Sequence, residues 1–311
     1  MRAAAIFRPG SSERDLKPFQ EKSNASWLIG MPSDSKQADA VLIFGGDGTV
    51  HRHLERLVKL QLPVLIVPRG SGNDFARALN LKRIRDAITA WKKFVSDASN
   101  VRTIDLGVIT CCADPVEPAD PGALKPETQS PLLRNQKYFC CVAGVGLDGE
   151  IVRYANKLPR WLRAHGGYAL TLPQALFHFA PFLMKISIPD TVQPRRFVQR
   201  TAKPTILAAF ANTPSYGGGM KIAPQAKLDD GQLAICLITD IDKFKLFCLF
   251  PTVYFGRHIS IPEVEYFQTP ALRVETEHPL EVYADGEYVG QTPIDVSVRA
   301  AALPVIVPPC A

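Results

Sequence analysis

The 311-residue sequence lacks the long apolar runs of a membrane protein, since none reaches the about 18 residues that a spanning helix needs. The apolar stretch in MRAAAIFRPGSS is too short for a secretory leader. The seven cysteines form no C-x-x-C spacing, and their number is odd. The adjacent pairs Cys111-Cys112 and Cys140-Cys141 are typical of small buried hydrophobic residues in a reducing compartment. We therefore expect a cytoplasmic protein without spanning helices.

Signals for nucleic-acid binding are also missing, because the sequence has neither zinc-finger spacing nor a run of interleaved basic and aromatic residues. The composition, 46% hydrophobic and 21% charged, is that of a globular chain. The net charge of +6 suits a nucleotide or an acidic membrane surface. We expect no nucleic-acid partner, and nothing in the sequence predicts an oligomeric state.

Two common phosphate-binding fingerprints are absent. No G-x-x-x-x-G-K-[ST] occurs, and G-x-G-x-x-G does not fit after the apolar run 40–44. That run leads instead into GGDGT, residues 45–49. Three glycines in four residues are costly to order, but they let main-chain N–H groups approach an anion such as a phosphate. The alternative interpretation is a tight turn with an Asp or Thr cap.

Apolar runs and periodicity predict an α/β domain over residues 1–100. Residues 3–7, 40–44 and 63–68 are predicted strands, and 50–60 has the apolar spacing of a helix that begins near Val50. A second glycine-rich turn, RGSGNDF, precedes another predicted helix. This order of strands, glycine loops and helices is typical of a parallel sheet.

Strand-like segments predominate after residue 100, which predicts a second, β-rich domain over 101–311 with largely antiparallel strands. Residues 113–136 hold five prolines and many polar residues, as in an exposed insertion within a hairpin.

The motifs resemble one enzyme family. GGDGT is similar to a loop of diacylglycerol and sphingosine kinases, NAD kinases and, more loosely, phosphofructokinases. PRGSGNDFA, residues 68–76, resembles P-x-G-[ST]-x-N-D-F-A of the diacylglycerol kinase catalytic family, which NAD kinases lack. GVGLD (144–148), GGG with LDDG (217–231) and DGE (285–287) follow in family order. The resemblance covers nearly the whole chain. It implies an NAD kinase/lipid kinase-like fold whose C-terminal end returns to the first domain.

The resemblance implies that both glycine-rich loops bind ATP. Asp47 would repel a phosphate unless a cation lies between them, which favours a Mg²⁺-bound nucleotide. Asp74 is alternatively a cap of the following helix. Ser33 and Ser35 are further candidates for a nucleotide contact. The residues expected at the nucleotide are Gly45, Gly46, Asp47, Gly48, Thr49, Val50, His51, Arg52, Gly70, Ser71, Gly72, Asn73 and Asp74.

The resemblance assigns the proton acceptor of the reaction to Glu287, with Asp285 two residues away to orient it or to hold the metal. A carboxylate near the acceptor hydroxyl is suited to this task. Judged locally, the same residues also predict a hairpin turn, because Asp-Gly is a strong turn signal. Both interpretations are compatible with one another.

A Mg²⁺ site is expected at the LDDG turn. The resemblance implies that Asp230 binds the ion together with the main-chain carbonyls of Lys227 and Gln232. Asp229 is an alternative ligand, and a capped turn without metal is the other interpretation.

The sequence departs from the family after GGDGT, where the usual Asn-Glu is replaced by His51-Arg52. This replacement of an acid by a base motivates an alternative hypothesis, a non-catalytic relative that binds nucleotide or lipid.

Two segments, 157–185 and 243–258, mix aromatic or apolar residues with basic ones. They are either buried core helices or a surface that lies on lipid headgroups, in which case the protein is peripheral at the inner face of the membrane. We therefore expect an ATP- and Mg²⁺-dependent kinase of a lipid hydroxyl, on diacylglycerol or a related lipid at a membrane surface. NAD kinase is the second enzyme hypothesis.

Overall fold

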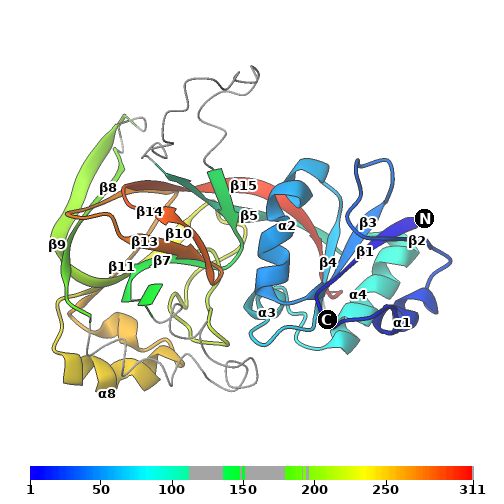
Figure 1. Cartoon of the computed structure of the whole chain (residues 1–311), viewed down its shortest axis with the longest axis horizontal. Coiled ribbons are helices and arrows are strands. Elements are labelled where there is room, and N and C mark those ends of the chain that lie inside the picture. Colours follow the sequence, from blue (N-terminus) through cyan, green and yellow to red (C-terminus); the bar gives the residue numbers. More distant parts are fainter. Residues whose placement is uncertain (112–135, 148, 151–178, 191, 194–195, 310–311) are drawn as a thin grey trace, which may run out of the picture.

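The computed structural model describes the chain except for residues 112–135, 148, 151–178, 191, 194–195 and 310–311 (Figure 1). Most of the predicted insertion 113–136 and of the segment 157–185, together with Asp148, therefore lies outside the described residues. The α-helices and strands are β1 (Arg2–Phe7), α1 (Lys17–Gln20), β2 (Ser26–Ile29), β3 (Ala40–Gly45), α2 (Asp47–Leu60), β4 (Val64–Pro68), α3 (Asp74–Ala78), α4 (Ile84–Asp97), β5 (Val101–Cys111), β6 (Gln136–Phe139), β7 (Val142–Gly146), β8 (Phe182–Pro189), β9 (Phe197–Ala211), β10 (Leu233–Thr239), α8 (Lys243–Val253), β11 (Val264–Thr269), β12 (Ala271–Thr276), β13 (Glu281–Ala284), β14 (Glu287–Gln291) and β15 (Ile294–Ile306).

The first part of the chain is a parallel sheet in the order β4-β3-β1-β2. Every residue of β3 and β4 is buried, which explains their continuous apolar sequences. The glycine-rich loops follow the carboxyl ends of these two neighbouring strands, so parallel pairing alone brings the loops together.

The helix after GGDGT begins at Asp47, three residues before the predicted start. Gly46 is its N-cap in an extended conformation, so Asp47 and Gly48 already belong to the first turn. The prediction was wrong because glycines and an aspartate are typical of loops, whereas here they form the start of a helix.

The later part of the chain is mostly antiparallel and includes the pairs β7–β9, β8–β9, β9–β10 and β13–β14. The predicted strand-like segment YFCCVAGVGL is split into β6 and β7 by a bend at Cys140-Cys141. Both cysteines are buried and free, as their neighbouring positions predicted.

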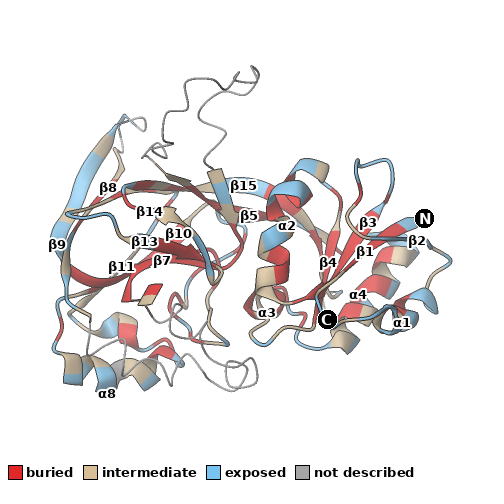
Figure 2. Ribbon diagram, viewed as in Figure 1, coloured by how far each residue is buried: buried red, intermediate tan, exposed pale blue. Residues whose placement is uncertain are grey.

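The strand β15 connects the two parts of the structure. It pairs antiparallel with β5 in both halves and with β12 in its first half, and near its end Val305 pairs in parallel with Val64 of β4. Ile294 and Val296 belong to one buried hydrophobic cluster, whereas Leu303 belongs to the other. Figure 2 shows the two buried regions along this strand. Among the described residues, no helix is long and apolar enough to cross a bilayer.

Candidate active site

The two glycine-rich loops touch through their backbones. A Cβ atom on Gly46 would lie 2.7 Å from the Gly70 Cα, and one on Gly70 would lie 2.4 Å from the Gly46 Cα. Real Cβ atoms do not approach so closely, so both positions require glycine. The side chain of Asn73, which has φ of 54°, accepts from the Gly70 N–H at 2.8 Å and donates to the Gly70 carbonyl at 2.7 Å. Asn73 therefore shapes the second loop.

Asp47 joins the first loop to the helix of the second. Its carboxylate accepts from the main-chain N–H groups of Asp74 at 3.1 Å and Phe75 at 3.0 Å, the first two residues of α3. Asp47 thus caps α3, although α2 is its own helix. Burial and the nearby charge of Asp74 raise the pKa of Asp47 to about 6, against the effect of these hydrogen bonds.

Asp74 is buried and does not cap the helix that it begins, in contrast to the alternative prediction. Its carboxylate accepts from the Gly218 N–H at 2.7 Å and from the Ser215 hydroxyl at 3.4 Å, and it pairs with Arg77. Asp74 therefore holds the Gly217–Gly219 turn of the later part against the second glycine-rich loop.

Asp285 is held at the first loop by main-chain donors. Its side chain is fully buried, and it accepts from the N–H groups of Cys140 and Cys141, both at 2.8 Å. The same carboxylate lies 3.1 Å from the His51 Nδ1, although the two residues are 234 positions apart in sequence. Since a carboxylate oxygen accepts, Nδ1 of His51 is the donor of this hydrogen bond.

The pKa of His51 lies above its usual value. Burial acts to lower this pKa, but the hydrogen bond to Asp285 and the charges of Asp285 and Glu287 outweigh that effect. His51 thus faces the DGE segment from the first turns of α2, and the acidic residues of that segment favour its charged form.

Glu287 is exposed and lies over the start of α2. A Cβ atom on Gly48 would be 3.3 Å from Oε1 of Glu287, which is tight. The absent side chain of Gly48 thus makes room for this carboxylate. The hairpin turn predicted at DGE is present as well, since β13 and β14 pair on either side of it and Asp285 has φ of 51°.

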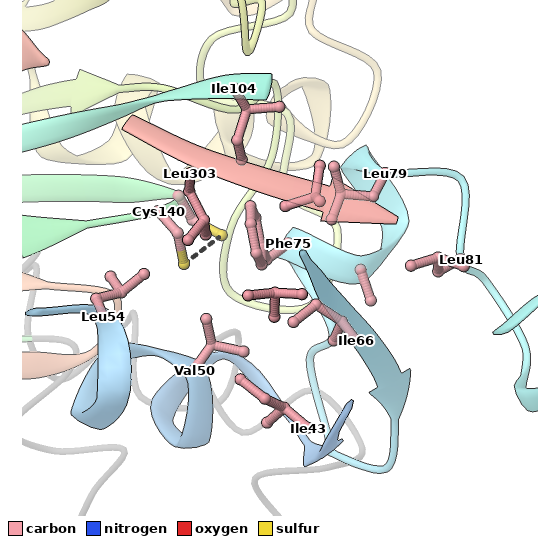
Figure 3. Close-up of a cluster of buried hydrophobic side chains, with 14 of the residues drawn as sticks. Ile43, Val50, Leu54, Ile66, Phe75, Leu79, Leu81, Ile104, Cys140 and Leu303 are labelled. Atoms are coloured by element: carbon pink, nitrogen blue, oxygen red, sulfur yellow. Dashed lines mark hydrogen bonds between the residues drawn. The ribbon is translucent and has the colours of Figure 1, made fainter. Parts of the chain in front are cut away.

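The remaining residues predicted to bind the nucleotide differ in burial: some lie in the core and others at the surface. Val50 and Thr49 are buried, and Figure 3 shows Val50 within a hydrophobic cluster that also contains Cys140. Ser71 is exposed at the second loop. Arg52 is exposed and donates from Nε to the Gly48 carbonyl at 3.1 Å. Ser33, Ser35 and Arg52 line a polar groove along α2.

The LDDG turn has the oxygen donors that Mg²⁺ prefers. Asp230 is exposed, and its Oδ1 accepts from the Gln232 N–H at 3.1 Å, whereas Asp229 forms an ion pair with Arg102 at 2.6 Å. A carboxylate and two main-chain carbonyls, of Lys227 and Gln232, are hard ligands that fit this ion. Asp229 is less suitable than Asp230 because its carboxylate already has a cationic partner.

No sequence pattern points to Asp105, which holds this turn in place. Asp105 is buried in β5 and accepts from the N–H groups of Gly231 and Ala301, both at 2.8 Å. Its position in TIDLGVI is that of an ordinary strand residue. Cys140, Cys141 and Gly218 were missed as site residues for a different reason, because they contribute N–H groups, which any residue type carries.

An apolar cavity lies beside the Gly217–Gly219 turn. Tyr216, Met220 and His258 are among the residues that line it, together with Leu246, Phe250 and Val253 of the α8 helix. The cavity itself is small, about 50 Å³, within a wider space of about 690 Å³ between the walls that includes open solvent. The cavity and the two glycine-rich loops are therefore neighbours across one short turn.

The fold is that of NAD kinases and lipid kinases. Crystal structures of a diacylglycerol kinase from Bacillus anthracis cover 99% of this chain and 97% of theirs, with TM-scores of 0.70 and 0.63 at 19% and 18% identity. An NAD kinase of Archaeoglobus fulgidus in complex with ATP gives a TM-score of 0.50 at 14% identity, over 99% of this chain and 94% of its own. The predicted fold class is thus confirmed.

Sequence comparison defines the family within this fold. Residues 3–109 match the diacylglycerol kinase catalytic domain, and residues 141–307 match the YegS C-terminal NAD kinase beta sandwich-like domain. A diacylglycerol kinase of Mycobacterium tuberculosis is 32% identical over 88% of this chain and 78% of its own length. A YegS-like lipid kinase of Chromohalobacter salexigens is 27% identical over 79% and 69%, respectively. The chain belongs to the diacylglycerol kinase catalytic family of lipid kinases.

Proposed function

We propose that this protein transfers the γ-phosphoryl group of ATP to the hydroxyl of diacylglycerol or a related lipid. The observation that carries the proposal is the position of the Gly217–Gly219 turn. Its Gly218 N–H binds Asp74 of the second glycine-rich loop, and Tyr216 and Met220, which flank the turn, line the apolar cavity. A phosphate donor and an apolar acceptor would thus meet at this turn.

The glycine-rich loops suit the phosphate end of this reaction. The N-terminus of α2 and the bare backbone of Gly45, Gly46 and Gly48 offer main-chain N–H groups to a phosphate. Phosphoryl transfer depends mainly on positioning and on neutralising charge. We assign positioning of the triphosphate to the two loops and to the groove beside Arg52.

We assign the proton acceptor to Glu287. Its carboxylate is exposed over Gly48, where an acceptor hydroxyl could reach both it and a phosphate held at the loop. Asp285, fixed by the N–H groups of Cys140 and Cys141, is two residues away and sets the position of the hairpin that carries Glu287. Geometry of this kind is the first requirement of a general base.

We propose two binding sites for Mg²⁺. One is bound with the nucleotide, where it neutralises phosphate charge. The other would be held by Asp230 and the carbonyls of Lys227 and Gln232, where it would stabilise the LDDG turn next to Asp105.

The acceptor is tested with labelled γ-phosphate from Mg-ATP, offered to a panel of diacylglycerol, sphingoid base, ceramide and phosphatidylglycerol in mixed micelles. The proposal predicts label on at least one lipid, with diacylglycerol the first candidate. NAD in the same panel tests the second hypothesis, and label on NAD alone would replace the lipid assignment. Binding of ATP without transfer to any acceptor would instead favour the non-catalytic relative.

A further inference from the structure

The α8 helix is apolar on both of its faces. Leu246, Phe250 and Val253 point to the cavity and line it. On the opposite face the side chains of Phe244 and Phe247 are exposed, at 74% and 46%. A helix that is hydrophobic all round is normally buried in a core or in lipid. The α8 helix instead separates the cavity from solvent. Figure 2 shows it at the lower left with few buried residues.

The exposed apolar residues of α8 continue into the turn that follows it. In the described part of the chain, all three phenylalanines with large exposure lie here, since Phe255 is 73% exposed. The spacing of three or four residues places the members on one side of the helix. The outer face of α8, as we define it, comprises Phe244, Phe247, Cys248, Pro251, Tyr254 and Phe255.

Basic residues flank this outer face. Lys243 and Lys245 are in the first turn of α8, and Lys245 pairs with Glu263. At the other end Arg257 is exposed, and the exposed Lys221 lies beside the helix because its N–H donates to the Val253 carbonyl at 3.0 Å. Aromatic residues between basic ones are the composition of helices that lie in the plane of an anionic bilayer surface.

The C-terminal end of the outer face is close to the candidate active site. The Val253 carbonyl at the end of α8 accepts from the Lys221 N–H at 3.0 Å, and three residues earlier the Gly218 N–H donates to Asp74 of the second glycine-rich loop at 2.7 Å. A surface seated on the outer face would therefore be near the cavity and the phosphate loops at the same time.

We propose that the outer face of α8 docks on the surface of an anionic bilayer, with the phenylalanines in the headgroup region and the flanking basic residues against acidic headgroups. The apolar cavity then lies directly behind the helix, separated only by its width of about 10 Å from the layer from which an acyl chain would come. The inference rests on the proposed function, but binding to vesicles is measurable without nucleotide and without turnover.

The test is cosedimentation of the full chain with vesicles of equal parts phosphatidylglycerol and phosphatidylcholine, and with phosphatidylcholine alone. The variant carries Phe244→Gln, Phe247→Gln and Phe255→Gln. A matched control carries Leu28→Gln, Ile29→Gln and Val198→Gln, three exposed apolar residues away from α8. We expect wild type and control to bind the anionic vesicles alike, and the α8 variant to bind at least about tenfold more weakly, equivalent to about 1.4 kcal/mol.

Phosphorylation of a short-chain, monomeric diacylglycerol separates the two proposals. The α8 variant should phosphorylate it at the wild-type rate, because no bilayer is involved and the fold is intact. Failure of wild type to label any lipid of the panel, short-chain diacylglycerol included, would overturn the proposed function but not the docking face. Vesicle binding that the α8 variant retains, or that wild type lacks, would overturn the docking face. If wild type is a dimer that does not bind vesicles, and the α8 variant is a monomer, the outer face of α8 instead binds a second copy of the chain.

Discussion

At the scale of single residues, the hydrogen bond between His51 and Asp285 connects the first motif of the chain with the last. We predict that His51→Asn retains kcat to within about threefold, because its side-chain amide places a donor near the position of Nδ1. His51→Leu should lower kcat about 10- to 100-fold, since a hydrogen bond to a charged group contributes about 1.5–3 kcal/mol. The kcat on the accepted lipid is compared with the nucleotide Kd, which should change little. Equal activity of both variants would contradict this positioning role of His51.

Asp47 is the second residue for which the structure predicts a measurable property. Its carboxyl has a pKa of about 6 in the folded protein, against a reference of 3.8, so the folded state binds the proton more tightly. This group therefore stabilises the fold at low pH, and the contribution is lost as pH rises from about 4 through 6.

Asn at this position does not titrate. We compare the Tm of Asp47→Asn with that of wild type at each pH. The difference, variant minus wild type, should increase between pH 4 and pH 7, whatever the difference is at pH 4. Thermal unfolding followed by calorimetry at several pH values checks this prediction. A difference that stays constant with pH would show that Asp47 has an ordinary pKa in the folded protein.

At the scale of elements, Gly48 at the start of α2 and Gly70 in the second glycine-rich loop lack a side chain for two different reasons. Gly70→Ala would bring a Cβ to 2.4 Å from the Gly46 backbone, which cannot move aside easily. Gly48→Ala would meet only the end of the Glu287 side chain at 3.3 Å, and alanine is the better helix former by up to about 1 kcal/mol.

We therefore predict opposite effects of the two substitutions. Gly70→Ala should lower the Tm and weaken nucleotide binding. Gly48→Ala should keep or raise the Tm but lower kcat, because it displaces Glu287. Calorimetry, nucleotide titration and kcat distinguish the two. A Gly48→Ala enzyme with full kcat would show that Glu287 does not need the space above this glycine.

The elements themselves were mostly predictable, and the reasons are physical. AVLIF and PVLIVP have the continuous apolar character of parallel strands buried on both faces, and both became such strands. The start of α2 was placed too late because Gly46, Asp47 and Gly48 have loop propensities. The contact of His51 with Asp285 and the two N–H groups that fix Asp285 have no periodic signal, since they depend on how distant strands assemble.

At the scale of the whole molecule, the central claim is that the chain returns from its later sheet to complete the site at α2. The structure shows this return of the chain, because β15 follows the DGE hairpin and pairs with β4 through Val305 and Val64. The catalytic contribution of Glu287, which this return delivers to the phosphate loop, is the part that requires measurement.

The most direct measurement is kcat for lipid phosphorylation by Glu287→Gln, with the nucleotide Kd measured in parallel. Glu281→Gln is the matched control, as an exposed glutamate at the start of the same hairpin. We predict that Glu287→Gln loses kcat about 10²- to 10⁴-fold while binding nucleotide like wild type, because it lacks a proton acceptor. Glu281→Gln should keep wild-type kcat. A Glu287→Gln enzyme that turns over like the control would contradict the account.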